Sequence, residues 1–138
     1  MIDIIKIGRT GITKDIDILI KYIEENSNEI ISVARINDND DNYSFIALFK
    51  DKCTIGKYSA LINEWGTNDG MSGEGGSGYI RMNNFLNKNH IKVFNMNLSN
   101  TDAKKIGYGF NKELTEWNDI VLIWKSYTYK LLQKSENL

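Results

Sequence analysis

Hydrophobic positions in the first 26 residues change from a strand-like pattern to a helical one. Residues 2–7 are rich in isoleucine and are followed by Gly8, which is typical of a short opening strand. Between Thr13 and Asn26, apolar residues recur at i, i+3, i+4 and i+7, so the pattern predicts an amphipathic helix with one buried stripe. Asp15 falls in the first turn of that helix, where the helix dipole favours a negative charge.

A run of six Asn and Asp residues, 37–42, separates two apolar segments. The flanking segments, 29–36 and 43–50, are apolar almost throughout, which is typical of strands covered on both faces. Asn and Asp tolerate turn conformations and form hydrogen bonds with their own backbone. The sequence therefore predicts a β-hairpin with an acidic tip that contains Asp38, Asp40 and Asp41.

The middle of the chain combines a helical pattern with a glycine-rich segment. Tyr58, Leu61, Ile62 and Trp65 have helical spacing, and Gly66 follows as a helix-ending glycine would, so we predict a helix over 58–65. Residues 66–78 contain six of the eleven glycines, which predicts a flexible loop.

The last third is expected to hold a helix over 79–86, a strand over 90–98 and a long helix over about 111–134. Ser99 and Asp102 have the spacing of a helix cap. Together the elements predict a single α+β domain over residues 1–138, in which a mixed or antiparallel sheet packs against helices and a long helix closes the chain. A chain of 138 residues is long enough for one hydrophobic core.

Composition removes several classes of function. The formal net charge is −1, which gives no general attraction for nucleic acid or an anionic membrane. A single cysteine (Cys53) and a single histidine (His90) exclude an internal disulfide and a Cys/His zinc site. We therefore expect no catalytic residues, no metal and no cofactor. The absence of a long apolar run also predicts a cytoplasmic protein without a membrane segment.

Charge is unevenly divided along the chain. Residues 1–69 carry 8 basic and 12 acidic groups, a balance of −4, whereas residues 70–138 carry 9 and 6, a balance of +3. The two halves could form opposed charged faces if they fold side by side. The preferred interpretation is that each half solvates its own surface.

The segment Gly73–Gly78 matches the glycine pattern G-x-G-x-x-G of dinucleotide-binding sites. Such a site requires the glycines to follow a strand and to open a helix. The predicted preceding element is instead a helix that ends at Trp65, and Glu74 would place a negative charge among phosphates. A loop that becomes ordered on contact with a partner is the preferred interpretation, and a small nucleotide-binding enzyme or module is the alternative.

Three features are typical of a protein that binds and inhibits another protein: no catalytic motif, divided charge, and aromatic residues beside a loop. In general appearance the chain resembles the immunity proteins that bacteria encode beside their own secreted toxins, as in contact-dependent inhibition systems. The resemblance implies a cognate toxin as the partner. A nuclease is one candidate, and its basic cleft would receive acidic side chains around aromatic anchors. The predicted partner-binding residues are Asp38, Asp40, Asp41, Tyr43, Trp65, Asp69 and Glu74.

A third class is a phage-type accessory or anti-defence protein that binds nucleic acid through its C-terminal half. Tyrosines and lysines gather there in the sequence: Tyr108, Tyr127 and Tyr129, with Lys104, Lys105, Lys125 and Lys130. Aromatic and basic side chains together can bind single-stranded nucleic acid. The net charge of −1 makes this partner the less favoured one, and the oligomeric state stays open.

Overall fold

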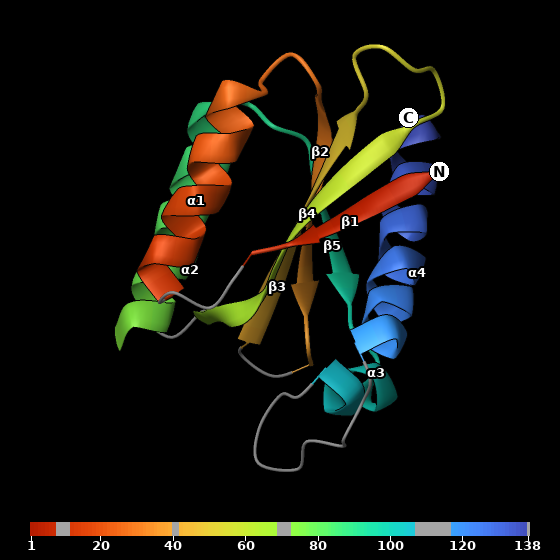
Figure 1. Cartoon of the computed structure of the whole chain (residues 1–138). Coiled ribbons are helices and arrows are strands. Elements are labelled where there is room, and N and C mark those ends of the chain that lie inside the picture. Colours follow the sequence, from red (N-terminus) through yellow and green to blue (C-terminus); the bar gives the residue numbers. More distant parts are fainter. Residues whose placement is uncertain (8–11, 40–41, 69–72, 107–116, 138) are drawn as a thin grey trace.

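The computed structural model describes residues 1–7, 12–39, 42–68, 73–106 and 117–137, and the side chains of 12, 64–68, 74, 75, 117 and 118 lie outside that description. The described elements form three layers, with a twisted sheet between two pairs of helices (Figure 1). In chain order they are β1 (Ile2–Lys6), α1 (Ile12–Glu25), β2 (Ile30–Asn37), β3 (Asn42–Lys50), β4 (Tyr58–Asn68), α2 (Gly73–Lys88), β5 (Val93–Asn97), α3 (Asn100–Ile106) and α4 (Trp117–Glu136).

The sheet has the strand order β1-β4-β3-β2-β5. β1 runs parallel to β4 and β2 runs parallel to β5, whereas β3 is antiparallel to both of its neighbours. Helix α1 connects β1 to β2, and α2 connects β4 to β5, so both connections cross the sheet in the same direction. Because crossover connections between parallel strands are right-handed, both helices lie on the same face of the sheet. Helices α3 and α4 lie on the other face (Figure 1).

Each face of the sheet buries its own hydrophobic cluster. The cluster between the sheet and helices α1 and α2 contains Ile16, Leu19, Ile23, Val33, Phe45, Ala47, Leu61, Met82 and Leu86. The cluster between the sheet and helices α3 and α4 contains Ala34, Ile36, Ile46, Leu48, Ala60, Ile62, Trp124, Tyr127 and Leu131. Consecutive residues of the central strands thus enter opposite clusters, which explains why their sequences are apolar almost throughout.

The predicted fold class is confirmed: the chain forms a single small α+β domain with a five-stranded mixed sheet and a long last helix. The hairpin of β2 and β3 is also confirmed, and Asn39 in its turn has a φ of 70°, a conformation that Asn tolerates better than most residues. At the predicted cap, the backbone N–H of Asp102 donates to Ser99 Oγ over 3.1 Å, and α3 begins at Asn100.

The helix predicted over residues 58–65 is wrong, because this segment belongs to the 11-residue strand β4. β4 lies between β1 and β3 and is covered on both faces: Ala60 and Ile62 enter one cluster and Leu61 the other. A strand that is buried on both faces has apolar residues at consecutive positions. Some of these apolar residues therefore also have the spacing of a helical face, which explains the wrong prediction.

The loop predicted over residues 66–78 is also wrong at both ends. β4 continues to Asn68 and α2 starts at Gly73, while residues 69–72 lie outside the described part of the chain. Glycine is unfavourable in helices, but Met82 and Leu86 of the same helix are buried against the sheet. Tertiary packing therefore outweighs the poor helix propensity of the first two turns.

Candidate functional site

Polar side chains gather on the α1/α2 face of the sheet, where β2 and β5 end. The strand register sets two rows: Phe45, Arg35 and Asn95 lie side by side, and Tyr43, Asn37 and Asn97 form the next row. Tyr79 and Asn83 of α2 border the rows. We call this surface the polar ledge and define it by Arg35, Asn37, Tyr43, Tyr79, Asn83, Asn95 and Asn97.

The ledge is open to solvent because α2 covers only part of this face. Val33, one same-face position before Arg35, is fully buried under the helices. Beyond it, Arg35 and Asn37 are half-buried, and Asn95 and Asn97 on the edge strand β5 are exposed. The surface is therefore continuous with the hydrophobic cluster on one side and accessible on the other.

Two asparagine side chains hold Arg35 in place. Its Nε–H donates to Asn95 Oδ1 over 2.9 Å, and an Nη1–H donates to Asn83 Oδ1 on α2. These bonds connect β2 to the edge strand and to the helix. They fix the plane of the guanidinium group on the ledge.

An aromatic pair forms the other end of the ledge. The rings of Tyr43 and Tyr79 lie 4.7 Å apart between centroids, and Tyr79 also packs over Phe45 at 6.5 Å. Phe45 is fully buried, whereas both tyrosines are half-buried. Tyrosines in this position present an apolar ring and a polar hydroxyl to a partner, and they are enriched in protein interfaces.

The hairpin turn begins directly beside the ledge. Asp38 Oδ2 accepts a hydrogen bond from Asn42 Nδ2 over 3.1 Å, and Asn39 Nδ2 donates to the carbonyl oxygen of Leu98 over 3.0 Å. The backbone of Asn42 pairs with Asn68 at the end of β4. The turn, the end of β4 and the segment after β5 therefore meet at one end of the sheet.

Of the predicted partner-binding residues, Asp38 and Tyr43 lie together at this end of the sheet. Trp65 lies in β4 and Glu74 in the first turn of α2, but their side chains are outside the described residues. Asp40, Asp41 and Asp69 lie wholly outside the described residues.

The sequence interpretation missed Arg35, Tyr79, Asn83, Asn95 and Asn97. One signal was readable. Val33-x-Arg35-x-Asn37 and Val93-x-Asn95-x-Asn97 both change from apolar to polar at alternate positions, which indicates a strand face that emerges from the core.

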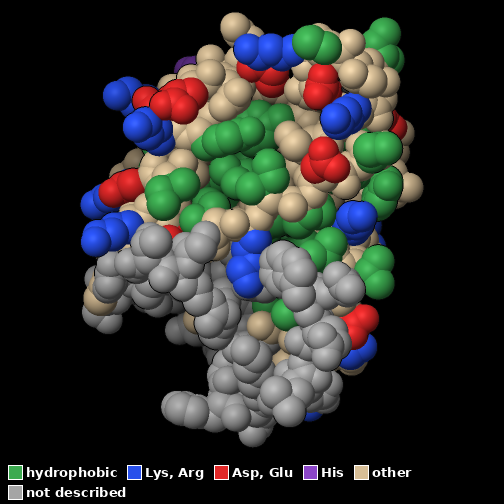
Figure 2. Space-filling model, viewed as in Figure 1, with side chains coloured by type: hydrophobic (Ala, Val, Ile, Leu, Met, Phe, Trp, Pro, Cys, Tyr) green, Lys and Arg blue, Asp and Glu red, His purple; other side chains and the backbone are tan. Residues whose placement is uncertain are grey.

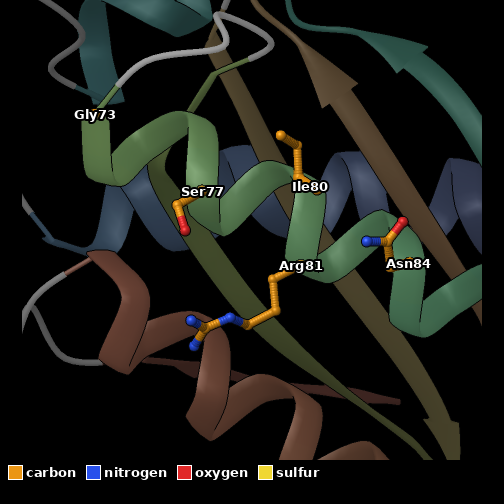
Figure 3. A pocket seen from close by; sticks show the side chains of 5 residues that line it. All are labelled: Gly73, Ser77, Ile80, Arg81 and Asn84. Atoms are coloured by element: carbon orange, nitrogen blue, oxygen red, sulfur yellow. The ribbon is translucent and has the colours of Figure 1, made fainter.

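The glycine pattern of residues 73–78 needs a second correction, because the element before it is the strand β4 and not a helix. The glycines thus open a helix that comes after a strand, as a dinucleotide site requires, but residues 69–72 separate them from β4 and lie outside the described residues. Along the same helix, Gly73, Ser77, Ile80, Arg81 and Asn84 line an open hollow of about 440 Å³ (Figure 3). Arg81 Nη1 lies 2.6 Å from Asp17 Oδ1 of α1, so this guanidinium already has a carboxylate partner.

Cys53, His90 and Tyr127 lie apart from the ledge, and Tyr108 lies outside the described residues. Cys53 is exposed in the β3–β4 connection, and His90 is exposed with a φ of 53°. Tyr127 is buried rather than on the surface, and its hydroxyl donates to Asp102 Oδ2 over 2.8 Å. Burial raises the pKa of the Tyr127 phenol, the bond to Asp102 acts in the same direction, and the backbone N–H of Ser99 opposes them. The proposed basic-aromatic surface therefore loses one of its tyrosines.

Charges of both signs are mixed on the face shown in Figure 2, where Lys and Arg side chains lie beside Asp and Glu side chains around a hydrophobic area. Within the described residues, no group of three or more His, Cys, Asp or Glu side chains is placed to bind a metal ion. None of the described helices is long and apolar enough to span a bilayer. Comparisons with protein-family models, curated proteins and solved structures give no significant match.

Proposed function

We propose that this protein is a cytoplasmic, non-enzymatic inhibitor of the immunity type, which binds a cognate bacterial toxin and covers its active site. The polar ledge carries the proposal. It combines two tyrosines, an oriented arginine and several asparagine side chains on one open surface beside the acidic hairpin turn. Tyrosine and arginine are the residue types that dominate binding energy in protein interfaces.

The test is co-expression of the protein with the product of its neighbouring gene, followed by co-purification and measurement of Kd. Tyr43→Ala and Tyr79→Ala are each expected to weaken binding about tenfold or more, because each removes an aromatic anchor. Tyr129→Ala is the matched control, since Tyr129 is 48% exposed on α4, on the other side of the sheet. Failure of the two proteins to associate, or equal effects of all three variants, contradicts the proposal.

A second candidate, a nucleotide-binding module, is favoured by one observation: the glycine pattern opens α2 after β4, and α2 leads to β5, which runs parallel to β4. A nucleotide bound to the native state raises the thermal midpoint by mass action. A thermal-shift measurement with ATP and NAD at about 1 mM tests this candidate. An unchanged midpoint with both ligands counts against it.

A further inference from the structure

Arg35 has donors that no described residue uses. A guanidinium group carries five N–H donors, and the bonds to Asn95 and Asn83 use two of them. No ion pair joins Arg35 to a carboxylate within the described residues, although Arg81 of α2 has Asp17 as its partner. Arg35 is thus an oriented cation on an open surface without a described counter-ion.

The two asparagines extend this set of donors. Because both amide oxygens face the guanidinium, the amide N–H₂ groups of Asn83 and Asn95 are turned away from it. Neither N–H₂ group has an acceptor among the described residues. The ledge around Arg35 therefore presents N–H donors, and its complement is a group that only accepts hydrogen bonds.

We propose that Arg35 is the recognition site for a carboxylate, supplied by an Asp or Glu side chain of a protein partner. A planar guanidinium binds a planar carboxylate through two parallel hydrogen bonds, and its prior fixation by Asn83 and Asn95 reduces the entropy lost on binding. The tyrosine pair lies on the same ledge, and partner contacts around its rings would exclude water from the carboxylate. This inference rests on the proposed function in assigning the carboxylate to a protein.

The surroundings of Arg35 favour a single carboxylate over a nucleic acid. Asp38 follows Asn37 in the turn beside the ledge, and the sequence continues with Asp40 and Asp41. A polyanion that extends beyond Arg35 toward the turn would meet Asp38, whereas one carboxylate needs only the arginine and the adjacent amides.

The first experiment uses the protein alone and does not depend on a toxin. The chain contains three arginines, so a ¹⁵N-correlated NMR spectrum shows three Nε–H side-chain signals, and the spectrum of Arg35→Lys assigns the one from Arg35. Sodium acetate and inorganic phosphate are titrated separately at constant ionic strength. We expect acetate to shift the Arg35 signal saturably, while the signal of Arg81, which is already paired, moves much less.

Asn95→Asp provides the matched control variant. It places a carboxylate where Asn95 Oδ1 already accepts from Arg35, so the guanidinium charge is compensated from within and the acetate response is expected to weaken strongly. Equal shifts of Arg35 and Arg81, or an undiminished response in Asn95→Asp, overturn the inference. A saturable response to phosphate without one to acetate shows that the ligand is a phosphate and also overturns the carboxylate assignment.

The second experiment uses the complex with the product of the neighbouring gene. Arg35→Ala is expected to raise Kd about 30-fold and Arg35→Lys about tenfold, because lysine keeps the charge but lacks the planar pair of donors. Arg81→Lys, the control, is expected to change Kd less than threefold by the same criterion. A complex that forms with unchanged Kd in the Arg35 variants refutes the inference and leaves the proposed function standing. Absence of any complex refutes the proposed function. The acetate titration then shows by itself whether Arg35 binds a carboxylate.

Discussion

Replacement of Asn63 by leucine is expected to stabilise the protein. Asn63 lies in β4 opposite Phe45, on the α1/α2 face, and only 3% of its surface is exposed. Its Nδ2 group is buried and has no hydrogen-bond partner among the described residues. Leucine branches at the same atom as asparagine and has the same number of side-chain heavy atoms, so Asn63→Leu removes the unpaired donor and keeps the branch point, while its methyl groups occupy more volume than the amide.

The expected gain follows from the cost of an unsatisfied donor. A buried polar group without a partner costs about 1–3 kcal/mol, and asparagine is in addition disfavoured in strands. A gain of about 2 kcal/mol corresponds to roughly 8 °C in the thermal midpoint of a domain of this size.

Urea unfolding followed by circular dichroism measures the change. The midpoint is expected to rise at an unchanged m-value, because the surface exposed on unfolding stays nearly the same. Asn97→Leu is the matched control: Asn97 is an exposed strand residue, and its replacement is expected to change stability by less than about 0.5 kcal/mol. An Asn63→Leu variant at or below the wild-type midpoint refutes the reasoning, since removal of the unpaired donor would then bring no net gain in stability.

Three further predictions concern the other face and the β3–β4 connection. Tyr127→Phe is expected to cost about 1–2 kcal/mol near neutral pH, because it removes the hydrogen bond to the half-buried Asp102. The folded-state pKa of Tyr127 lies above its ordinary value of 10.0. The contribution of the protonated phenol to stability is therefore present below pH 10 and is lost as the pH rises through the folded-state pKa. The urea midpoints of wild type and Tyr127→Phe should converge at alkaline pH. Trp124→Ala, at a fully buried position, is expected to cost about 3–5 kcal/mol in the same assay. Backbone N–H groups of Cys53 and Thr54 lower the pKa of Asp51 below 3.8. The contribution of the ionised carboxylate to stability is therefore present above that pH and is lost as the pH falls. Between pH 5 and pH 2, the thermal midpoint of Asp51→Asn should decline less than that of the wild type.

Local patterns in the sequence are sufficient for elements whose signals are local. Helix α1 has one buried stripe, and the Asn/Asp run that predicts the hairpin lies in its turn. β4 was not predictable in the same way, because a strand buried on both faces loses the alternation that identifies strands. The glycines of α2 wrongly indicated a loop. That helix is held by packing of its later turns and not by intrinsic propensity.

The polar ledge was only partly predictable because it depends on pairing between strands far apart in the chain. Tyr43 and Asp38 belong to a local hairpin, and the sequence places them near each other. Arg35 meets Asn95 only because β5 pairs with β2 in a register that no local pattern specifies. Tyr79 joins them because α2 crosses the sheet on the same face as these strands.

The pairing of β1 with β4 has a consequence for synthesis of the chain. Among the described strands β1 pairs with β4 alone, so it stays without that pairing partner until Tyr58–Asn68 has been made. At a usual rate of translation this interval lasts roughly 3 to 12 s. The β2–β3 hairpin can form meanwhile, and β4 joins β1 to it because β4 pairs with both β3 and β1. During the interval the nascent chain carries an isoleucine-rich segment with unpaired backbone groups, the kind of segment from which aggregation starts.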